Sequence, residues 1–342
     1  MKRFLDSKSI LKYLLGIMLV AGLFFTSGNL IADDLADWDQ LINQANTQFD
    51  NEQYEDAVNL ATQAKELAET KLGQDHPATI NSLFTLGTFY GALGYPDEAI
   101  DFQSQALSLA IAVYGEDQPD TISIKENLSQ LYAEQGRFDE AIPLLESVIV
   151  FKKNSFGESD PNTLSTQLIL AQVLEGLGDY NSAEKLLNEI ITGYSQSLGD
   201  NNADTLYARE SLASVLKVQG RFEEAEEIYN EVYSVKLEQF GEANPETILT
   251  MGSLAEIYHK MGVYDEAEPL YVRSIELFQQ VIGDEEPELY FILSNYAQLL
   301  QDLGRYVEAE LRFLAVYEFE NATLGENHPN TIIDLNNLAG VY

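Results

Sequence analysis

The sequence predicts an all-α protein built from stacked antiparallel helix pairs. Three observations lead to this prediction. Apolar residues recur at helical spacing through most of the chain. Glycines recur at one fixed interval, at Gly73, Gly115, Gly157, Gly199, Gly241, Gly283 and Gly325. Alanines keep the same interval, at Ala57, Ala99, Ala141, Ala183, Ala225, Ala267 and Ala309. A fixed period of this length is typical of a repeat array.

Residues 1–32 have the composition of a targeting segment. A basic stretch with Lys2, Arg3, Lys8 and Lys12 precedes the apolar run 13–25, and small and polar residues follow it. This order is typical of a secretory signal peptide. The run is shorter than the roughly 20 residues of a spanning helix, but an uncleaved N-terminal anchor stays an alternative. We therefore expect an exported protein that is periplasmic or secreted. If residues 13–25 are retained, we expect them to anchor it to the inner membrane.

Residues 33–72 are predicted to form an atypical N-terminal capping helix pair. They keep the repeat positions Ala45, Tyr54 and Ala57, but carry Gln44 and Gln48 where later units are apolar. A terminal repeat needs a polar outer face, because no neighbour covers it.

Residues 73–330 are predicted to form six repeats of this period, each with two helices. In the unit 79–115, the first helix ends at Gly94, and the second runs from about Asp97 to Tyr114. The loop threonine, here Thr79, and an Asp or Asn before it are candidate helix caps, and the upstream proline is expected to stop the preceding segment. Small residues such as Gly87 are expected where the two helices approach most closely.

Residues 331–342 are predicted to form the first helix of a further, incomplete repeat. Leu335, Leu338 and Val341 have the spacing of a first helix, but the sequence ends before a second one. Two interpretations stay open: an interrupted array, or a lone helix that serves as the terminal cap.

Composition and motifs argue against several classes of function. A net charge of −37 disfavours nucleic-acid binding, which needs a basic surface. The absence of cysteine excludes thiolate chemistry. His76 and His328 occupy one repeat position, and His259 stands alone on a predicted helix. No phosphate loop, nucleophile elbow or metal-ligand spacing is present. We expect no enzyme activity, no cofactor and no metal site.

At its motifs the chain resembles a known family. Gly304-Arg305-Tyr306-Val307-Glu308-Ala309 and Leu324-Gly-Glu-Asn-His-Pro-Asn-Thr331 are similar to the 42-residue tetratricopeptide repeats of kinesin light chains and of related bacterial proteins. The resemblance covers about residues 36–342. It implies a right-handed superhelical solenoid whose concave groove, lined by the first helices, binds a peptide. A motor-related function does not carry over to an exported chain.

The candidate groove residues lie on the sides of the first helices opposite their apolar columns. They fall at repeat offsets spaced four, three and four residues. The offset of Asn81 is polar in the early repeats and apolar later, and the same offsets also hold Glu256 and Lys260. The predicted partner-binding residues are Asn81, Thr85, Asn127, Gln130, Gln172, Tyr207, Ser211, Leu249, Ser253, Phe291, Asn295, Gln298 and Asn337.

The sequence thus predicts a scaffold that binds a protein or peptide of unknown identity, with the membrane involved only through an uncleaved N-terminal segment. An alternative is a docking or regulatory half of a larger protein. Similar bacterial chains sometimes carry a peptidase-like domain after the array, which here would lie beyond residue 342. A third hypothesis is loose binding of divalent cations by the acidic surface.

Overall fold

The structure is a computed structural model that describes residues 29–283, 286–326 and 328–341. This part of the chain is all-α, with fifteen α-helices and one π-helical turn and no strand. Residues 1–28, with the predicted anchor 13–25, lie outside the described residues. The predicted boundary at residue 32 falls inside the first described helix. No helix of the described ranges is long and apolar enough to cross a membrane.

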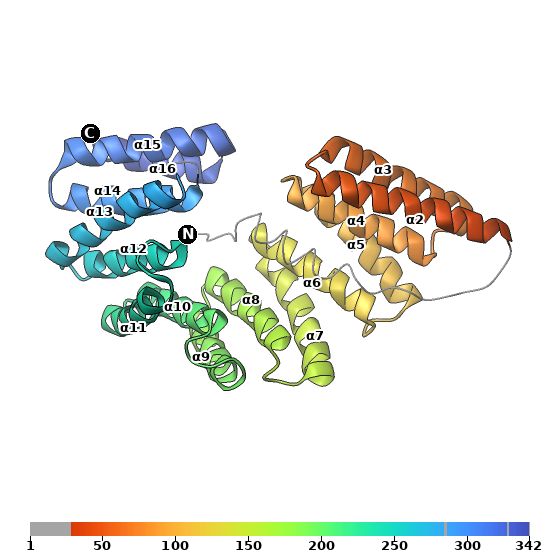
Figure 1. Cartoon of the computed structure of the whole chain (residues 1–342), viewed down its shortest axis with the longest axis horizontal. Coiled ribbons are helices and arrows are strands. Elements are labelled where there is room, and N and C mark those ends of the chain that lie inside the picture. Colours follow the sequence, from red (N-terminus) through yellow and green to blue (C-terminus); the bar gives the residue numbers. More distant parts are fainter. Residues whose placement is uncertain (1–28, 284–285, 327, 342) are drawn as a thin grey trace. The chain divides into compact units, whose positions relative to one another are not determined.

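The helices alternate between first and second members of hairpins (Figure 1). The first members are α2 (Asn29–Asp50), α4 (Pro77–Ala92), α6 (Pro119–Glu134), α8 (Pro161–Leu177), α10 (Ala203–Val218), α12 (Pro245–Lys260), α14 (Pro287–Asp302) and α16 (Pro329–Ala339). The second members are α3 (Tyr54–Leu67) with its π-helical extension Ala68–Leu72, α5 (Pro96–Val113), α7 (Phe138–Phe156), α9 (Tyr180–Ser197), α11 (Phe222–Phe240), α13 (Tyr264–Val281) and α15 (Tyr306–Leu324).

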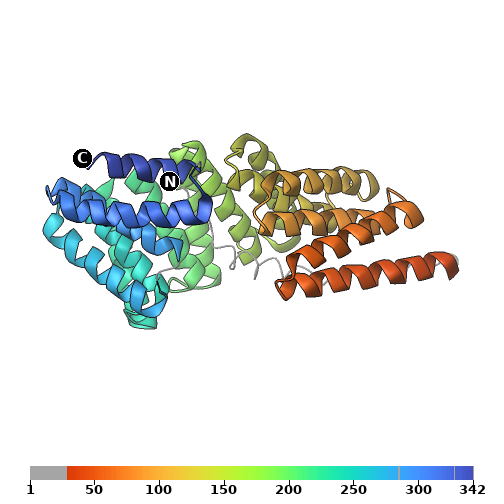
Figure 2. The ribbon, with the colours of Figure 1, turned by 90° about the horizontal axis from the view of Figure 1, so that it is seen from above.

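The chain divides into two compact units, one up to Ser182 and one from Ala183 onward. In the first unit α2 packs against α3, α4 against α5 and α6 against α7; in the second, α10 packs against α11, α12 against α13 and α14 against α15. Second helices also contact the next first helix, as α5 does α6 and α13 does α14 (Figure 2). Each unit is therefore a stack of helical hairpins, and the all-α repeat fold is confirmed.

The small residues do mark the close approach of the two helices. All seven alanines of the series from Ala57 to Ala309 are completely buried. Across from Ala99, a Cβ added at Gly87 would lie 2.7 Å from Gln103 Cγ and 3.1 Å from the Ala99 carbonyl oxygen. The series of Gly87 stays buried up to Ala297, but its last member, Ala339, is exposed.

The ends of the first helices fall where the glycines predict them. Gly94 has a left-handed φ of 78°, and the next residue, Tyr95, donates its backbone N–H to the Tyr90 carbonyl at 2.9 Å. This geometry closes the helix, and a residue without Cβ adopts it at no steric cost.

The predicted N-caps were wrong by several residues. The proline does not stop the preceding segment: it is the first residue of the helix, where its missing N–H has no partner to lose. The cap is the residue before it. His76 Nδ1 accepts from the Ala78 N–H at 3.1 Å, and Asp160 does the same for Asn162 at 2.9 Å. The threonine instead donates its hydroxyl to the loop glycine, as Thr79 does to the Gly73 carbonyl at 2.8 Å.

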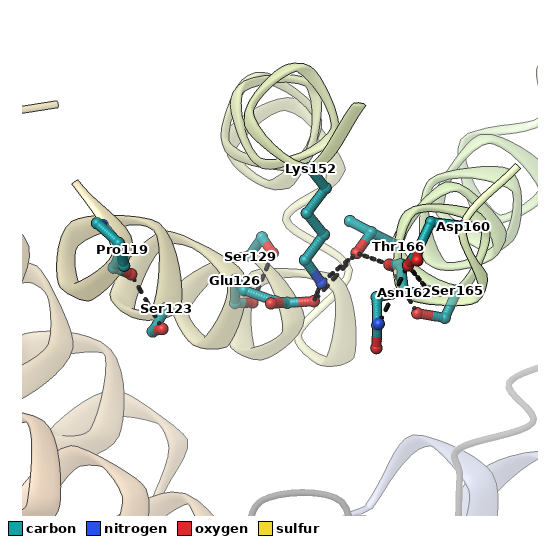
Figure 3. Close-up of polar contacts among 9 residues, drawn as sticks. All are labelled: Pro119, Ser123, Glu126, Ser129, Lys152, Asp160, Asn162, Ser165 and Thr166. Carbon is teal, nitrogen blue, oxygen red and sulfur yellow. Dashed lines mark hydrogen bonds and ion pairs between the residues drawn. The ribbon is translucent and has the colours of Figure 1, made fainter. Parts of the chain in front are cut away.

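A largely buried ion pair joins three successive helices in the first unit. Lys152 on α7 donates to Glu126 Oε1 on α6 at 2.7 Å and to Thr166 Oγ1 on α8 at 2.8 Å. The threonine hydroxyl in turn donates to Glu126 at 3.1 Å. Figure 3 shows the lysine reaching between the two flanking helices. One cation and one anion therefore balance each other at this contact, with both Lys152 and Glu126 less than a quarter exposed.

The same arrangement recurs two repeats later in the second unit. Lys236 on α11 donates to Glu210 on α10 at 2.9 Å and to Thr250 on α12 at 3.1 Å. Each of these residues stands exactly two periods after its counterpart. One repeat before Glu210, Lys236 and Thr250, the equivalent positions hold Leu168, Tyr194 and Ala208. The sequence thus alternates between an ion pair and less polar residues at these three repeat positions.

Candidate functional site

The first column of predicted groove residues is apolar in the second unit. Tyr207, Leu249, Phe291 and Ile333 come from α10, α12, α14 and α16, one from each first helix. The first three are half-buried, and Ile333 is 56% exposed. Leu249 also packs against the buried cluster of this unit, so its surface is shared between the core and solvent.

In the first unit the same column is polar. Asn81 is exposed and accepts a hydrogen bond from Thr85 Oγ1 at 3.4 Å. Ser123 and Ser165, its counterparts in the next repeats, turn their hydroxyls to backbone carbonyls of their own helices. This unit offers no apolar strip at this offset.

Two residues of the second column are not accessible, and their assignment to the groove was wrong. Thr85 is 2% exposed and Ser253 is 5% exposed. Spacing along a helix defines which side a residue lies on, but it does not define how far neighbouring helices cover that side. A half-buried Ser211 donates to the Tyr207 carbonyl at 3.0 Å, which uses its hydroxyl within the helix.

The second column also holds three asparagines. Asn127, Asn295 and Asn337 are each half-buried. The Nδ2 group of Asn295 is enclosed and has no hydrogen-bond partner. Among the described residues, none makes a side-chain hydrogen bond to Asn127 or Asn337. A buried amide donor without a partner costs free energy, so the Asn295 side chain would be stabilised by an acceptor that a change of its rotamer brings within reach.

The third column holds glutamines and one unexpected ion pair. Gln130 donates to Glu134 at 3.3 Å, and burial raises the pKa of that carboxyl although the hydrogen bond opposes the rise. Gln172 is half-buried and Gln298 is exposed. Glu256, at the same offset, is 2% exposed and accepts from Lys217 Nζ at 2.7 Å. It is therefore part of a contact between two repeats rather than a groove residue.

The histidines have structural partners. His76 and His328 cap α4 and α16 through Nδ1, as expected for one repeated position. His259 is buried on α12, and its Nε2 lies 2.9 Å from Asp302 Oδ2 on α14. Sequence alone could not pair these two, because they lie on first helices of different repeats. Within the described ranges no three His, Asp or Glu side chains gather in a way that could hold a metal ion.

Comparison with known families decides what this array is. The model of the tetratricopeptide repeat family matches residues 40–110, 86–154, 162–238, 203–280 and 246–319, well over half of the chain. The chain is a tetratricopeptide repeat protein. The family predicted from the motifs at 304–309 and 324–331 is therefore confirmed. No curated protein matches the sequence.

Solved structures of tetratricopeptide proteins share the fold. A tetratricopeptide repeat protein from Parabacteroides merdae is 18% identical with a TM-score of 0.66, over 90% of this chain and 99% of that one. The repeats of a putative kinesin light chain from Podosopora anserina are 23% identical with a TM-score of 0.55, over 59% and 96%. A Rap protein in complex with competence and sporulation factor is 14% identical with a TM-score of 0.53, over 92% and 98%.

Proposed function

We propose that this tetratricopeptide protein is a non-enzymatic interaction scaffold that binds an extended peptide segment of a partner protein along the first helices of its second unit. The observation that carries the proposal is the pairing of two columns. The apolar column from Tyr207 to Ile333 runs beside the amides of Asn295 and Asn337. The Nδ2 group of Asn295 has no hydrogen-bond partner among the described residues.

The chemistry of the two columns suits a peptide. Backbone N–H and C=O groups of a ligand bind side-chain amides, which are both donor and acceptor. Half-buried Tyr207 and Phe291 would contact the ligand's apolar side chains, since aromatic residues bury a large area at low entropic cost. The complex of the Rap protein with competence and sporulation factor is a precedent for ligand binding on a related array.

Site-specific crosslinking tests the groove directly. The chain contains no cysteine, so one introduced cysteine carries a photo-crosslinker at a single known place. We would use Gln298→Cys in the groove of the full chain and Phe240→Cys, which is 47% exposed on α11, as the control. Both labelled proteins are irradiated in the native envelope fraction.

A partner crosslinked at position 298 and absent at position 240 supports the groove. Adding Tyr207→Ser and Phe291→Ser to the Gln298→Cys protein should then reduce that product at least tenfold, with the helix content unchanged by circular dichroism. Equal crosslinking at both positions, or an unchanged product in the double variant, contradicts the groove assignment.

We further propose that the scaffold works outside the bacterial cytoplasm. The support is the basic stretch before the apolar run 13–25 in the sequence. Fusing alkaline phosphatase after Tyr342 tests this, because the enzyme is active only after export. An active fusion that becomes inactive on deletion of residues 13–25 is expected. Equal activity without those residues would refute the proposal.

A further inference from the structure

The outer side of α15 carries an apolar stripe. Val307, Leu311 and Leu314 stand four and three residues apart, on one side of the helix, and are 73%, 63% and 38% exposed. The opposite side of the same helix holds the core residues Ala309 and Phe313, both fully buried. The helix is therefore apolar on two sides, and only one of them packs within the described part of the chain. A second apolar stripe on a surface helix is unusual unless a partner covers it.

The other repeats provide an internal reference for this stripe. At the three equivalent positions, the six earlier second helices carry almost only polar residues. The first position holds Glu55, Asp97, Asp139, Asn181, Glu223 and Asp265. The second holds Asn59, Asp101, Pro143, Lys185, Glu227 and Pro269, and the third Thr62, Ser104, Glu146, Asn188, Asn230 and Val272. The repeat fold does not require apolar residues here, so the stripe has another cause.

The stripe continues onto α13. Arg305, the residue before α15, forms an ion pair with Glu268 on α13, which places the two second helices side by side. The outer surface of α13 has an open hollow of about 540 Å³ lined in part by Pro269 and Val272. Pro269 and Val272 stand one repeat before Leu311 and Leu314, and both are apolar.

The charges beside this surface are mainly negative. Glu318 is exposed on α15, as is Asp265 on α13, and the exposed Arg312 is the opposing charge on α15. Arg305 is paired with two carboxylates, Glu268 and Glu308, which leaves that cluster negative, and Arg273 is paired with Glu242. A second copy of this chain, also at −37, would bring like charges together, so charge favours a basic occupant.

We propose that the outer surface of α13 and α15, formed by Pro269, Val272, Val307, Leu311 and Leu314, docks an amphipathic helix of another protein whose apolar stripe is edged by lysine or arginine. Apolar anchors spaced four and three residues match a helix laid along a helical surface. This surface belongs to the second helices, and is therefore distinct from the proposed peptide groove on the first helices.

The test measures binding of a synthetic peptide to the full chain. The peptide is an 18-residue alanine-based helix with leucines at i, i+4 and i+7 and lysines along both edges of that stripe. A second peptide of equal charge has glutamine in place of leucine. Fluorescence anisotropy at 150 mM salt gives the dissociation constants, and sedimentation gives the oligomeric state. The test variant, Val307→Glu with Leu311→Glu and Leu314→Asn, copies Glu223, Glu227 and Asn230 of α11.

The matched control removes exposed apolar residues elsewhere. Val150→Glu with Phe156→Glu and Leu177→Asn makes the same charge change at positions 59%, 56% and 47% exposed. A single Leu311→Glu variant guards against loss of folding, which circular dichroism checks for every protein. The test variant adds two negative charges, so electrostatics alone would tighten its binding of a lysine-rich peptide.

We expect the leucine peptide to bind the control at least as tightly as the parent, the test variant at least tenfold more weakly than the parent, and Leu311→Glu several-fold more weakly. The glutamine peptide should bind all four proteins weakly, and should bind the test variant no more weakly than the parent. Equal affinity of the leucine peptide for parent and test variant overturns the proposal. A parent that sediments as a dimer, with a monomeric test variant, also overturns it, because the stripe would then pair with a second copy.

Discussion

Replacing Lys236 by methionine removes the cation from a buried contact between repeats. The lysine is 5% exposed and its partner Glu210 is 8% exposed. After the change, Glu210 still accepts from the hydroxyl of Thr250 but has lost its cation. At 2.9 Å and an effective dielectric constant of about 20, the lost attraction is about 6 kcal/mol, and part of it is offset because the lysine no longer has to be desolvated. Leaving one charge buried without its partner typically costs about 3–5 kcal/mol.

A triple exchange separates this cost from the worth of the ion pair itself. Glu210→Leu, Lys236→Tyr and Thr250→Ala introduce the residues that stand one repeat earlier, at 168, 194 and 208. Replacing a complete buried pair by apolar residues of similar volume is often neutral or stabilising. We expect the local stability of the triple variant to lie within about 1 kcal/mol of that of the parent, although it changes three residues and Lys236→Met changes only one.

Hydrogen exchange read by mass spectrometry is the suitable assay, because repeat arrays open locally and do not have one global free energy of unfolding. In Lys236→Met, exchange in α10–α12 should be at least about 100-fold faster than in the parent. Lys185→Met, at an exposed lysine of α9, is the control and should change exchange little. Protection lost equally in the single and triple variants would refute the reasoning, since the cost would then come from packing and not from the unpaired charge.

Three further predictions concern single residues. Burial and the neighbouring Glu320 raise the pKa of Asp334 to about 6, above its usual 3.8. The folded state therefore holds this proton more tightly, so the stability of α16 should fall as the pH rises from about 4 to about 6. Exchange in α16 measured against pH should show this fall, and Asp334→Asn should abolish it. Ala225→Leu should lower the melting temperature, since overpacking a fully buried site costs about 1–3 kcal/mol; an unchanged value contradicts the packing. Asn295→Ala should leave the local stability of α14, measured by hydrogen exchange, unchanged or up to about 1 kcal/mol higher, because it removes an unpaired buried donor, yet should weaken crosslinking of the partner.

The repeat period predicts the hairpins well because the features that define them are local. Gly94 needs its left-handed conformation whatever surrounds it, and Ala99 must be small because a helix backbone lies against it. The caps were misplaced for an equally local reason. A proline can stop one helix or start the next, and the sequence does not separate the two roles. The hydrogen bond that His76 accepts from the Ala78 N–H shows that the proline starts the helix.

The groove and the ion pairs depend on contacts between repeats, which a single repeat does not encode. Thr85 and Ser253 lie at the same offset as the half-buried Asn295, and differ only in what neighbouring helices cover. A signal for the ion pairs was nevertheless present. Lys152 and Lys236 stand two repeats apart at a position where the intervening Tyr194 is apolar, which is unexpected for solvated lysines.

The alternation of ion-pair and less polar residues along the sequence has a physical consequence for how the repeats stack. Neighbouring repeats are similar enough that a stack displaced by one unit would still bury its alanines. Such a displacement would, however, place Lys236 or Glu210 in surroundings that now bury Tyr194 or Phe278, both of which are 2% exposed. A buried charge without its partner is far more costly than the small net gain of a correct ion pair. We therefore expect the two ion pairs to destabilise a displaced stack more than they stabilise the correct one.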